Sequence, residues 1–202
     1  MHLDIPAGDF AGYIFDCDGT LIDSMPVHYR AWDEAMRHQG MPGQLDEALF
    51  YSLGGVPTRR VAQLIAEHYG LKIDVEKVFH EKESLFLKLL ADVRHIEPVV
   101  AFAKRAVAQG KPVSVASGGP RDVVHHSLKL AGLAPLFPVV VTPEDVAHGK
   151  PAPDMFLLAA KKMGVPASKC LVFEDAEPGH QGAKAAGMKS VHVPSRGPRG
   201  QK

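Results

Sequence analysis

Two aspartates follow directly on a short run of apolar residues near the N-terminus. Ala11–Phe15 has the pattern of a buried strand, and Asp16, Asp18 and the turn sequence Gly19-Thr20 come next. Two carboxylates at the end of a buried strand repel each other and lose hydration, so they persist mainly where a cation or a reaction uses them. The alternative is a solvated turn whose aspartates cap a helix. The pattern favours metal binding or acid–base chemistry.

Polar side chains also follow the later apolar runs of the chain. Ser117 and Gly118 come after the second such run, Lys150 lies beyond the third, and Glu174 and Asp175 follow the fourth. Carboxylates can hold Mg²⁺, and the metal together with a lysine, a hydroxyl and backbone amides can neutralise and orient a phosphoryl group. A carboxylate can attack phosphorus, and a second one can move the protons. The set is therefore suited to phosphoryl transfer.

Short apolar strands that alternate with helices must bring these residues together. Strand patterns cover residues 11–15, 111–116, 138–141, 170–173 and 190–193. Helical spacing covers residues 25–39, 57–68, 75–90, 97–109, 122–131, 153–163 and 178–186. This alternation predicts an α/β fold with a doubly wound parallel sheet, in which ligands bind at the carboxyl ends of the strands.

The helices before residue 95 have no strand between them, which indicates an insertion after the first strand. We therefore expect two domains, an α/β core of residues 1–20 and 95–202 and a helical cap of residues 21–94.

Composition narrows the class of protein. The chain has 202 residues, with 23 Lys and Arg against 23 Asp and Glu, so nothing in its net charge favours nucleic acid or an anionic membrane as a partner. Its two cysteines are too few for a disulfide framework. The N-terminal residues lack the pattern of a signal peptide, and no apolar run is long enough to span a membrane. We expect a cytoplasmic protein, monomeric by default.

Four motifs, in this order, resemble those of the haloacid dehalogenase (HAD) superfamily. They are Asp16-Cys17-Asp18-Gly19-Thr20, Ser117, Lys150 within Gly-Lys-Pro-Ala-Pro-Asp, and Glu174-Asp175. Three further segments, His28–Trp32, Phe173–Gly179 and Gln181–Gly187, resemble the β-phosphoglucomutase-type group and its sugar-phosphatase relatives. Gly55–Thr58 and the helix after it resemble the fructose-1-phosphate phosphatase-like branch in particular. The resemblance covers nearly the whole chain and implies a HAD-type core with an inserted helical cap.

The resemblance implies a role for each core residue. Asp16 would be the nucleophile and a Mg²⁺ ligand, and Asp18 would be the general acid and base and bind the metal through its backbone carbonyl. Asp175 would be the main remaining ligand, with Glu174 close to the metal or to its waters.

The resemblance also implies binding roles. Ser117, with Gly118, and Lys150 would hold the phosphoryl group of a small phosphorylated metabolite. In the cap, His28 and Lys82 match positions that face the sugar phosphate or assist closure.

Two departures from the mutase pattern favour a phosphatase. Where mutases carry a Ser-Lys pair for a distal phosphate, this chain has Gly119-Pro120, with Arg121 as the nearest cation. The distal-phosphate arginine of the mutase cap aligns with Thr58. We therefore predict a Mg²⁺-dependent sugar phosphatase that acts through an aspartyl-phosphate. A phosphosugar mutase is the alternative, and a phosphoacceptor switch resembling a receiver domain is a remote one.

Taken singly, several of these residues also have a purely structural interpretation. Ser117 could cap a helix, as could Glu174-Asp175, and Lys150 could be a solvated loop residue. His28 could be packed in the core, and Lys82 could lie on a solvated helix face.

Overall fold

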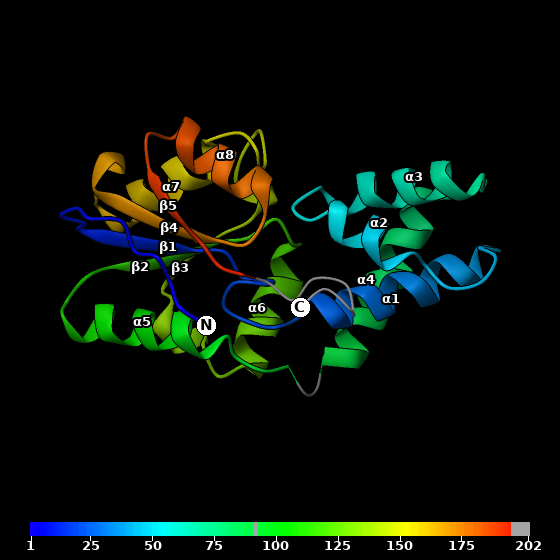
Figure 1. The fold of residues 1–202 in the computed structure, drawn as a ribbon, viewed down its shortest axis with the longest axis horizontal. Coiled ribbons are helices and arrows are strands. Elements are labelled where there is room, and N and C mark those ends of the chain that lie inside the picture. The colour runs from blue at the N-terminus through cyan, green and yellow to red at the C-terminus, as the bar shows by residue number, and fades with distance from the viewer. Residues whose placement is uncertain (91–92, 195–202) are drawn as a thin grey trace.

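A five-stranded parallel sheet forms the centre of the larger part of the molecule (Figure 1). The computed structural model describes residues 1–90 and 93–194. The strands lie in the order β3-β2-β1-β4-β5. Their bounds are β1 Gly12–Phe15, β2 Val113–Ala116, β3 Val139–Val141, β4 Cys170–Glu174 and β5 Lys189–His192. Because β1 lies in the middle, Asp16 comes directly off the central strand.

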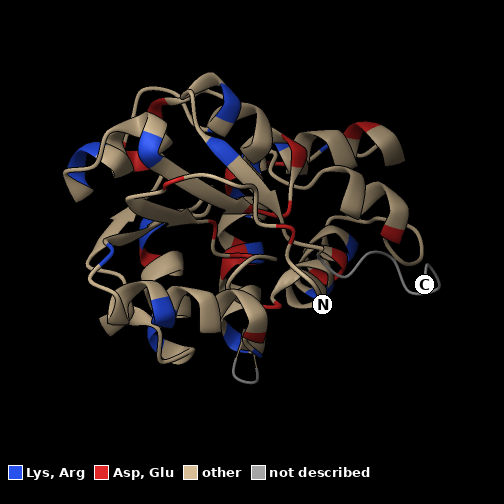
Figure 2. Cartoon of the chain, turned by 60° about the vertical axis from the view of Figure 1, so that its left-hand side comes forward, with Lys and Arg blue, Asp and Glu red and all other residues tan. Residues whose placement is uncertain are grey.

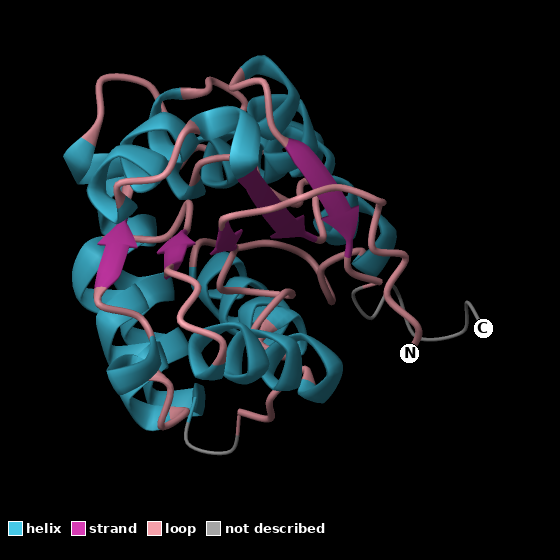
Figure 3. Ribbon diagram, turned by 90° about the vertical axis from the view of Figure 1, so that its left-hand side faces the viewer, coloured by secondary structure: helices cyan, strands magenta, loops and turns pink. Residues whose placement is uncertain are grey.

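Helices cover both faces of the sheet (Figure 3). One face packs against α5 (Glu97–Ala108) and α6 (Arg121–Leu130), and the other against α7 (Asp154–Met163) and α8 (Glu177–Ala185). Successive residues of a strand point to opposite faces, so Phe15 joins the first core cluster and Ile14 the second. Short continuous apolar strands are what a sheet buried on both faces requires.

Four more helices pack together beside the carboxyl ends of the strands (Figure 1). They are α1 (Met25–His38), α2 (Glu47–Ser52), α3 (Thr58–Tyr69) and α4 (Val75–Leu89). Their core contains Trp32, Phe50, Ile65 and Val78, one from each helix. The two connections to the sheet run side by side, since Asp23 N donates to Arg94 O at 2.9 Å.

The predicted fold class is confirmed, and each predicted helix and strand is present with ends within two residues. Helix α2 is the main element that the sequence analysis did not predict. It is only six residues long, too short to show helical periodicity, but the Asp46 side chain caps it by accepting a hydrogen bond from Leu49 N at 2.8 Å.

Acidic and basic residues are interspersed over the ribbon, as expected from a formal net charge of zero (Figure 2). Among residues 1–90 and 93–194, no helix is both long and apolar enough to cross a membrane. Cys17 and Cys170 are both fully buried, where each packs as a small apolar side chain.

Candidate active site

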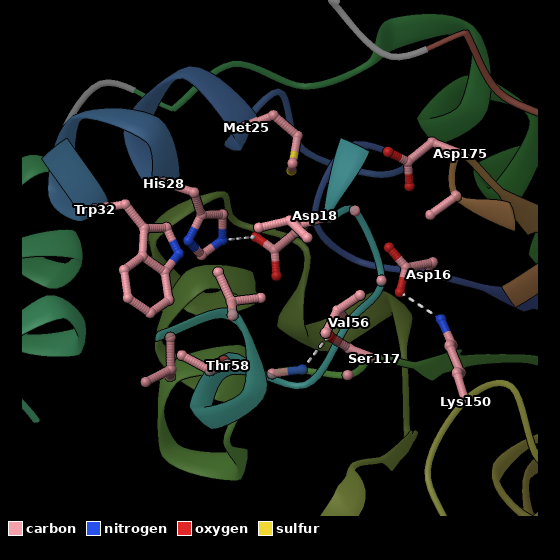
Figure 4. Close-up of a pocket in the computed structure, with 18 of the residues that line it drawn as sticks. Asp16, Asp18, Met25, His28, Trp32, Val56, Thr58, Ser117, Lys150 and Asp175 are labelled. Carbon is pink, nitrogen blue, oxygen red and sulfur yellow. Dashed lines mark hydrogen bonds and ion pairs between the residues drawn. The ribbon is translucent and has the colours of Figure 1, made fainter. Parts of the chain in front are cut away.

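The ends of three strand segments meet around the ammonium group of Lys150. Lys150 Nζ donates to Asp16 Oδ1 and to Glu174 Oε2, both at 2.7 Å (Figure 4 shows the first contact). All three side chains are at least nine-tenths buried. Lys150 is therefore not a solvated loop lysine, and it leaves Oδ2 of Asp16 outside this ion pair.

Burial and charge shift the titration of this group of residues. Burial raises the pKa of Asp16, Glu174 and Asp175 above the ordinary range, and the repulsion among the carboxylates adds to the effect. Burial lowers the pKa of Lys150, but Asp16 and Glu174 more than compensate, so the lysine stays charged. Three carboxyl groups thus share one ammonium, which leaves an excess of negative charge that a cation would relieve.

Two glycines allow these carboxylates to lie so close to the backbone. Gly19 has a φ of +83°, and a Cβ built on it would lie 2.2 Å from Asp175 Oδ2. A Cβ on Gly179 would lie 2.0 Å from Glu174 Cδ. Thr20 completes the arrangement by donating from Oγ1 to Asp175 Oδ1 at 3.2 Å.

Asp16, Glu174 and Asp175 could hold a metal ion together. One carboxylate oxygen from each lies within 4.8 Å of the others. Hard divalent cations such as Mg²⁺ prefer oxygen ligands and retain several waters, so a site made of three carboxylates fits such an ion.

Asp18 is linked to the helices that lie beside the sheet. Its Oδ1 accepts from Ser24 Oγ at 2.5 Å and lies 3.2 Å from His28 Nε2 (Figure 4). On the other side of the ring, His28 Nδ1 lies 2.9 Å from Lys82 Nζ. An ammonium group has only donors, so Nδ1 must accept, and Nε2 therefore carries the proton that it donates to Asp18.

This link lowers the pKa of the Asp18 carboxyl. Burial raises the pKa of Asp18, but His28 and Ser24 lower it by more, so the pKa ends below its ordinary value. The His28 ring also stacks on Phe86, with ring centroids 3.8 Å apart. His28 is thus more than a packed core residue, because both of its ring nitrogens are engaged.

A cavity of about 130 Å³ lies between the strand ends and the helices. Ten of the eleven candidate residues of the sequence analysis line it: Asp16, Asp18, His28, Thr58, Lys82, Ser117, Gly118, Lys150, Glu174 and Asp175. A second cavity of about 530 Å³ adjoins it. The two share the lining residues Thr58, Glu83, Gly118, Pro120 and Val123.

Ser117 holds the turn after β2 and also lines the cavity. Its Oγ accepts from Gly119 N at 3.2 Å, which fixes the turn after β2, and the residue also faces the cavity (Figure 4).

Arg121 does not reach the site. It lines neither of the two cavities, is half-exposed, and its Nη2 donates to Asp145 Oδ1 at 3.0 Å. As the first residue of α6, Arg121 is held at the surface by that carboxylate, so its proximity in sequence to Ser117 does not place its side chain in the cavity.

The side of the cavity formed by α1 to α4, here called the helical wall, contains residues that the sequence analysis missed. Trp32 and Glu83 both line the first cavity. Lys82 and Glu83 are 2 % and 7 % exposed, so neither is on a solvated face. A signal was available, because these two charged residues fall at the helical period of the buried Val78 and Phe86.

Comparison with known proteins agrees with this geometry. The sequence model of the haloacid dehalogenase-like hydrolase family matches residues 10–187 of this chain. The chain belongs to this family. It is 40% identical over 184 residues to the fructose-1-phosphate phosphatase YqaB of Escherichia coli (strain K12), covering 91% of this chain and 96% of that protein.

Two further proteins extend the comparison. Hexitol phosphatase A of E. coli is 31% identical over 190 residues, covering 93% of this chain and 86% of that protein. The crystal structure of β-phosphoglucomutase from Clostridium difficile superposes with a TM-score of 0.77 over 90% of this chain and 83% of that one. At 21% identity, that likeness speaks for the fold alone.

The predicted family is therefore confirmed, and so is the prediction of an enzyme, a phosphoric monoester hydrolase of the HAD family. The remote alternative of a receiver-like switch is set aside, since the match to a hydrolase family extends over most of the chain.

Proposed function

We propose that the enzyme hydrolyses a small sugar monophosphate with Mg²⁺, through an aspartyl-phosphate formed on Asp16. The observation that carries this proposal is the convergence of Asp16, Asp18, Ser117 and Lys150 on one cavity roofed by helices. The names of the two phosphatase relatives support a phosphorylated sugar or sugar alcohol as substrate.

Asp16 and Asp18 would divide the reaction between them. In the first step, Asp16 attacks phosphorus, the bond from phosphorus to the sugar oxygen breaks, and Asp18 gives that oxygen a proton. In the second step, Asp18 takes a proton from a water that attacks the aspartyl-phosphate, which releases phosphate and frees Asp16. The lowered pKa of Asp18 suits the second step, because an ionised carboxylate can accept the proton of water.

The remaining core residues would bind and neutralise the phosphoryl group. Lys150 and Ser117, with the backbone amide of Gly118, face the cavity beside Asp16. The carboxylates of Asp16, Glu174 and Asp175 would hold Mg²⁺. When bound, Mg²⁺ would offset the repulsion between the carboxylates and the phosphoryl oxygens.

We also propose that residues 21–94 act as a cap domain over a core of residues 1–20 and 95–202. The bonds of Asp18 to Ser24 and His28 support this division of labour, because they tie the acid–base carboxylate to the first helix of the proposed cap. Such a cap would exclude water while the phosphoryl group is transferred.

Among the described residues, no Lys or Arg of the two cavities is without a carboxylate partner, which supports a phosphatase over a mutase. In the described part of the chain, the Lys and Arg residues that line the two cavities are Lys82, Lys150 and Arg59. Each already contacts a carboxylate, since Arg59 donates to both oxygens of Glu76 at 2.6 and 2.9 Å and Lys82 donates to Glu83.

The test is incubation of the purified protein with Mg²⁺ and a panel of sugar monophosphates that includes fructose 1-phosphate and β-glucose 1-phosphate. Free phosphate and sugar isomers are followed together, with Asp16→Asn as the blank. We expect phosphate release that falls by about 10⁴-fold or more in the variant. Glucose 6-phosphate that forms without free phosphate, and only when a bisphosphate is present, would instead identify a mutase.

A further inference from the structure

Glu83 is the residue of the helical wall that the proposed mechanism does not use. It lies on α4, is 7 % exposed, and lines both cavities. Its Oε1 accepts from Lys82 Nζ at 3.0 Å. Its Oε2 is buried and has no hydrogen-bond partner among residues 1–90 and 93–194. A buried carboxylate oxygen without a donor is unfavourable, so a donor that enters the cavity would be bound there.

The surroundings of Glu83 indicate which kind of donor would bind. The phosphoryl group is taken by Lys150 and Ser117 at the strand ends, and a carboxylate would repel a second phosphate. On the same wall, Trp32, Phe50 and Val56 line the first cavity with apolar surface (Figure 4 labels Trp32 and Val56). A neutral hydroxyl on a carbon skeleton suits both features, because it can donate to Oε2 while its carbon atoms contact the apolar side chains.

We infer that Glu83 determines specificity by accepting a hydrogen bond from a hydroxyl group of the substrate. This inference rests on the proposed function and deepens it, since it selects phosphate esters of polyols over esters without hydroxyls. Lys82 holds Oε1 and leaves Oε2 available for the substrate. As the helices close over a bound polyol, the hydroxyl supplies the donor that Oε2 lacks.

The inference is tested with two substrates and matched variants. The substrates are the sugar phosphate of the panel that wild-type enzyme cleaves best and acetyl phosphate, which carries a phosphoryl group but no hydroxyl. The variants are Glu83→Gln, which keeps the volume of the side chain, Glu83→Ala, and Glu81→Gln as control. Glu81 lies on the same helix and contacts His38 and Gln39, away from both cavities.

For Glu83→Gln we expect kcat/KM to fall about tenfold for the sugar phosphate, mainly through KM, because a hydrogen bond to a charged acceptor is replaced by a neutral one. For Glu83→Ala we expect a fall of up to about 100-fold. Hydrolysis of acetyl phosphate should change by less than about twofold in Glu83→Gln, and Glu81→Gln should resemble wild type with both substrates.

Equal losses with both substrates in Glu83→Gln would overturn the inference, because they would mean that Glu83 only positions Lys82 and His28. Unchanged hydrolysis of the sugar phosphate in Glu83→Gln and Glu83→Ala would overturn it as well. Failure of wild-type enzyme to cleave any sugar phosphate is a different result, because it contradicts the proposed function before any variant is made.

Discussion

The strand ends and the helical wall of the cavity are built in different ways. At the strand ends, Lys150 donates to Asp16 and to Glu174, which lie at the ends of β1 and β4. On the helical wall, Glu83 keeps one oxygen without a donor. The ion pairs at the strand ends therefore form without a sugar, whereas the helical side has a buried carboxylate oxygen to which a bound hydroxyl could donate.

In the proposed function, the residues at the strand ends carry out the reaction, and the residues of the helical wall recognise the substrate. Phosphoryl transfer requires the same groups whatever alcohol leaves, and rigid strand ends position such groups well. In the proposed function, the alcohol would contact helix side chains, which can change without disturbing the sheet.

Removal of divalent cations should have the largest effect, since it acts on the centre of the strand-end wall. After dialysis against EDTA we expect hydrolysis of the best substrate to fall by at least about 10³-fold, and added Mg²⁺ should restore it. Mg²⁺ should also raise the Tm of wild type but not of Asp175→Asn, because that variant loses a ligand. Full activity in EDTA would show that the carboxylate cluster holds no catalytic metal.

Asp18→Asn should sharpen the comparison, because Asp18 follows the central strand while its carboxylate bonds to Ser24 and His28 on the helical side. We expect kcat for a sugar phosphate to fall by about 10²- to 10⁴-fold through loss of the acid–base group. The loss in the first step should be smaller with acetyl phosphate, whose leaving group needs no proton, so a phosphoenzyme should accumulate. This is measured by rapid quench with labelled substrate. A variant that keeps wild-type turnover would remove Asp18 from the mechanism.

Gly179→Ala tests how tightly the strand-end wall is packed. The added methyl group would collide with Glu174, so we expect the free energy of unfolding to fall by about 1–3 kcal/mol, measured in urea. Gly149→Ala is the matched control. Nothing lies within 4 Å of a Cβ at Gly149, and we expect a change below about 0.5 kcal/mol. If both variants are equally stable, the close approach at Gly179 is not a constraint.

Arg121→Ala should have the smallest effect. Its guanidinium contacts Asp145 outside both cavities, so we expect kcat/KM to stay within about twofold of wild type for every member of the panel. Steady-state kinetics with the sugar monophosphates decide this. A tenfold rise in KM would mean that the arginine swings into the site when substrate binds.

The strand-end wall could be predicted from the sequence because its signals are local. Asp16, Ser117 and Glu174 each follow a short apolar run, and the edge rule for parallel sheets brings such positions together wherever the strands form. The parallel sheet and the helical block after its first strand follow from the same alternation of apolar runs and helical spacing, whereas the order of the strands came from the tertiary structure. The approximate helix ends follow from periodicity and capping.

Only the tertiary structure shows which side chains form the helical wall. The helical period of α4 places Lys82 and Glu83 on its buried face, but their position beside the cavity depends on how α4 packs against α1, and no local pattern contains that packing. For this reason Arg121, a candidate from the sequence, lines neither cavity, whereas Glu83, which was not a candidate, lines both. A side chain near a motif can be held at the surface by a carboxylate distant in sequence, while a charge on a helix can be buried beside the substrate cavity.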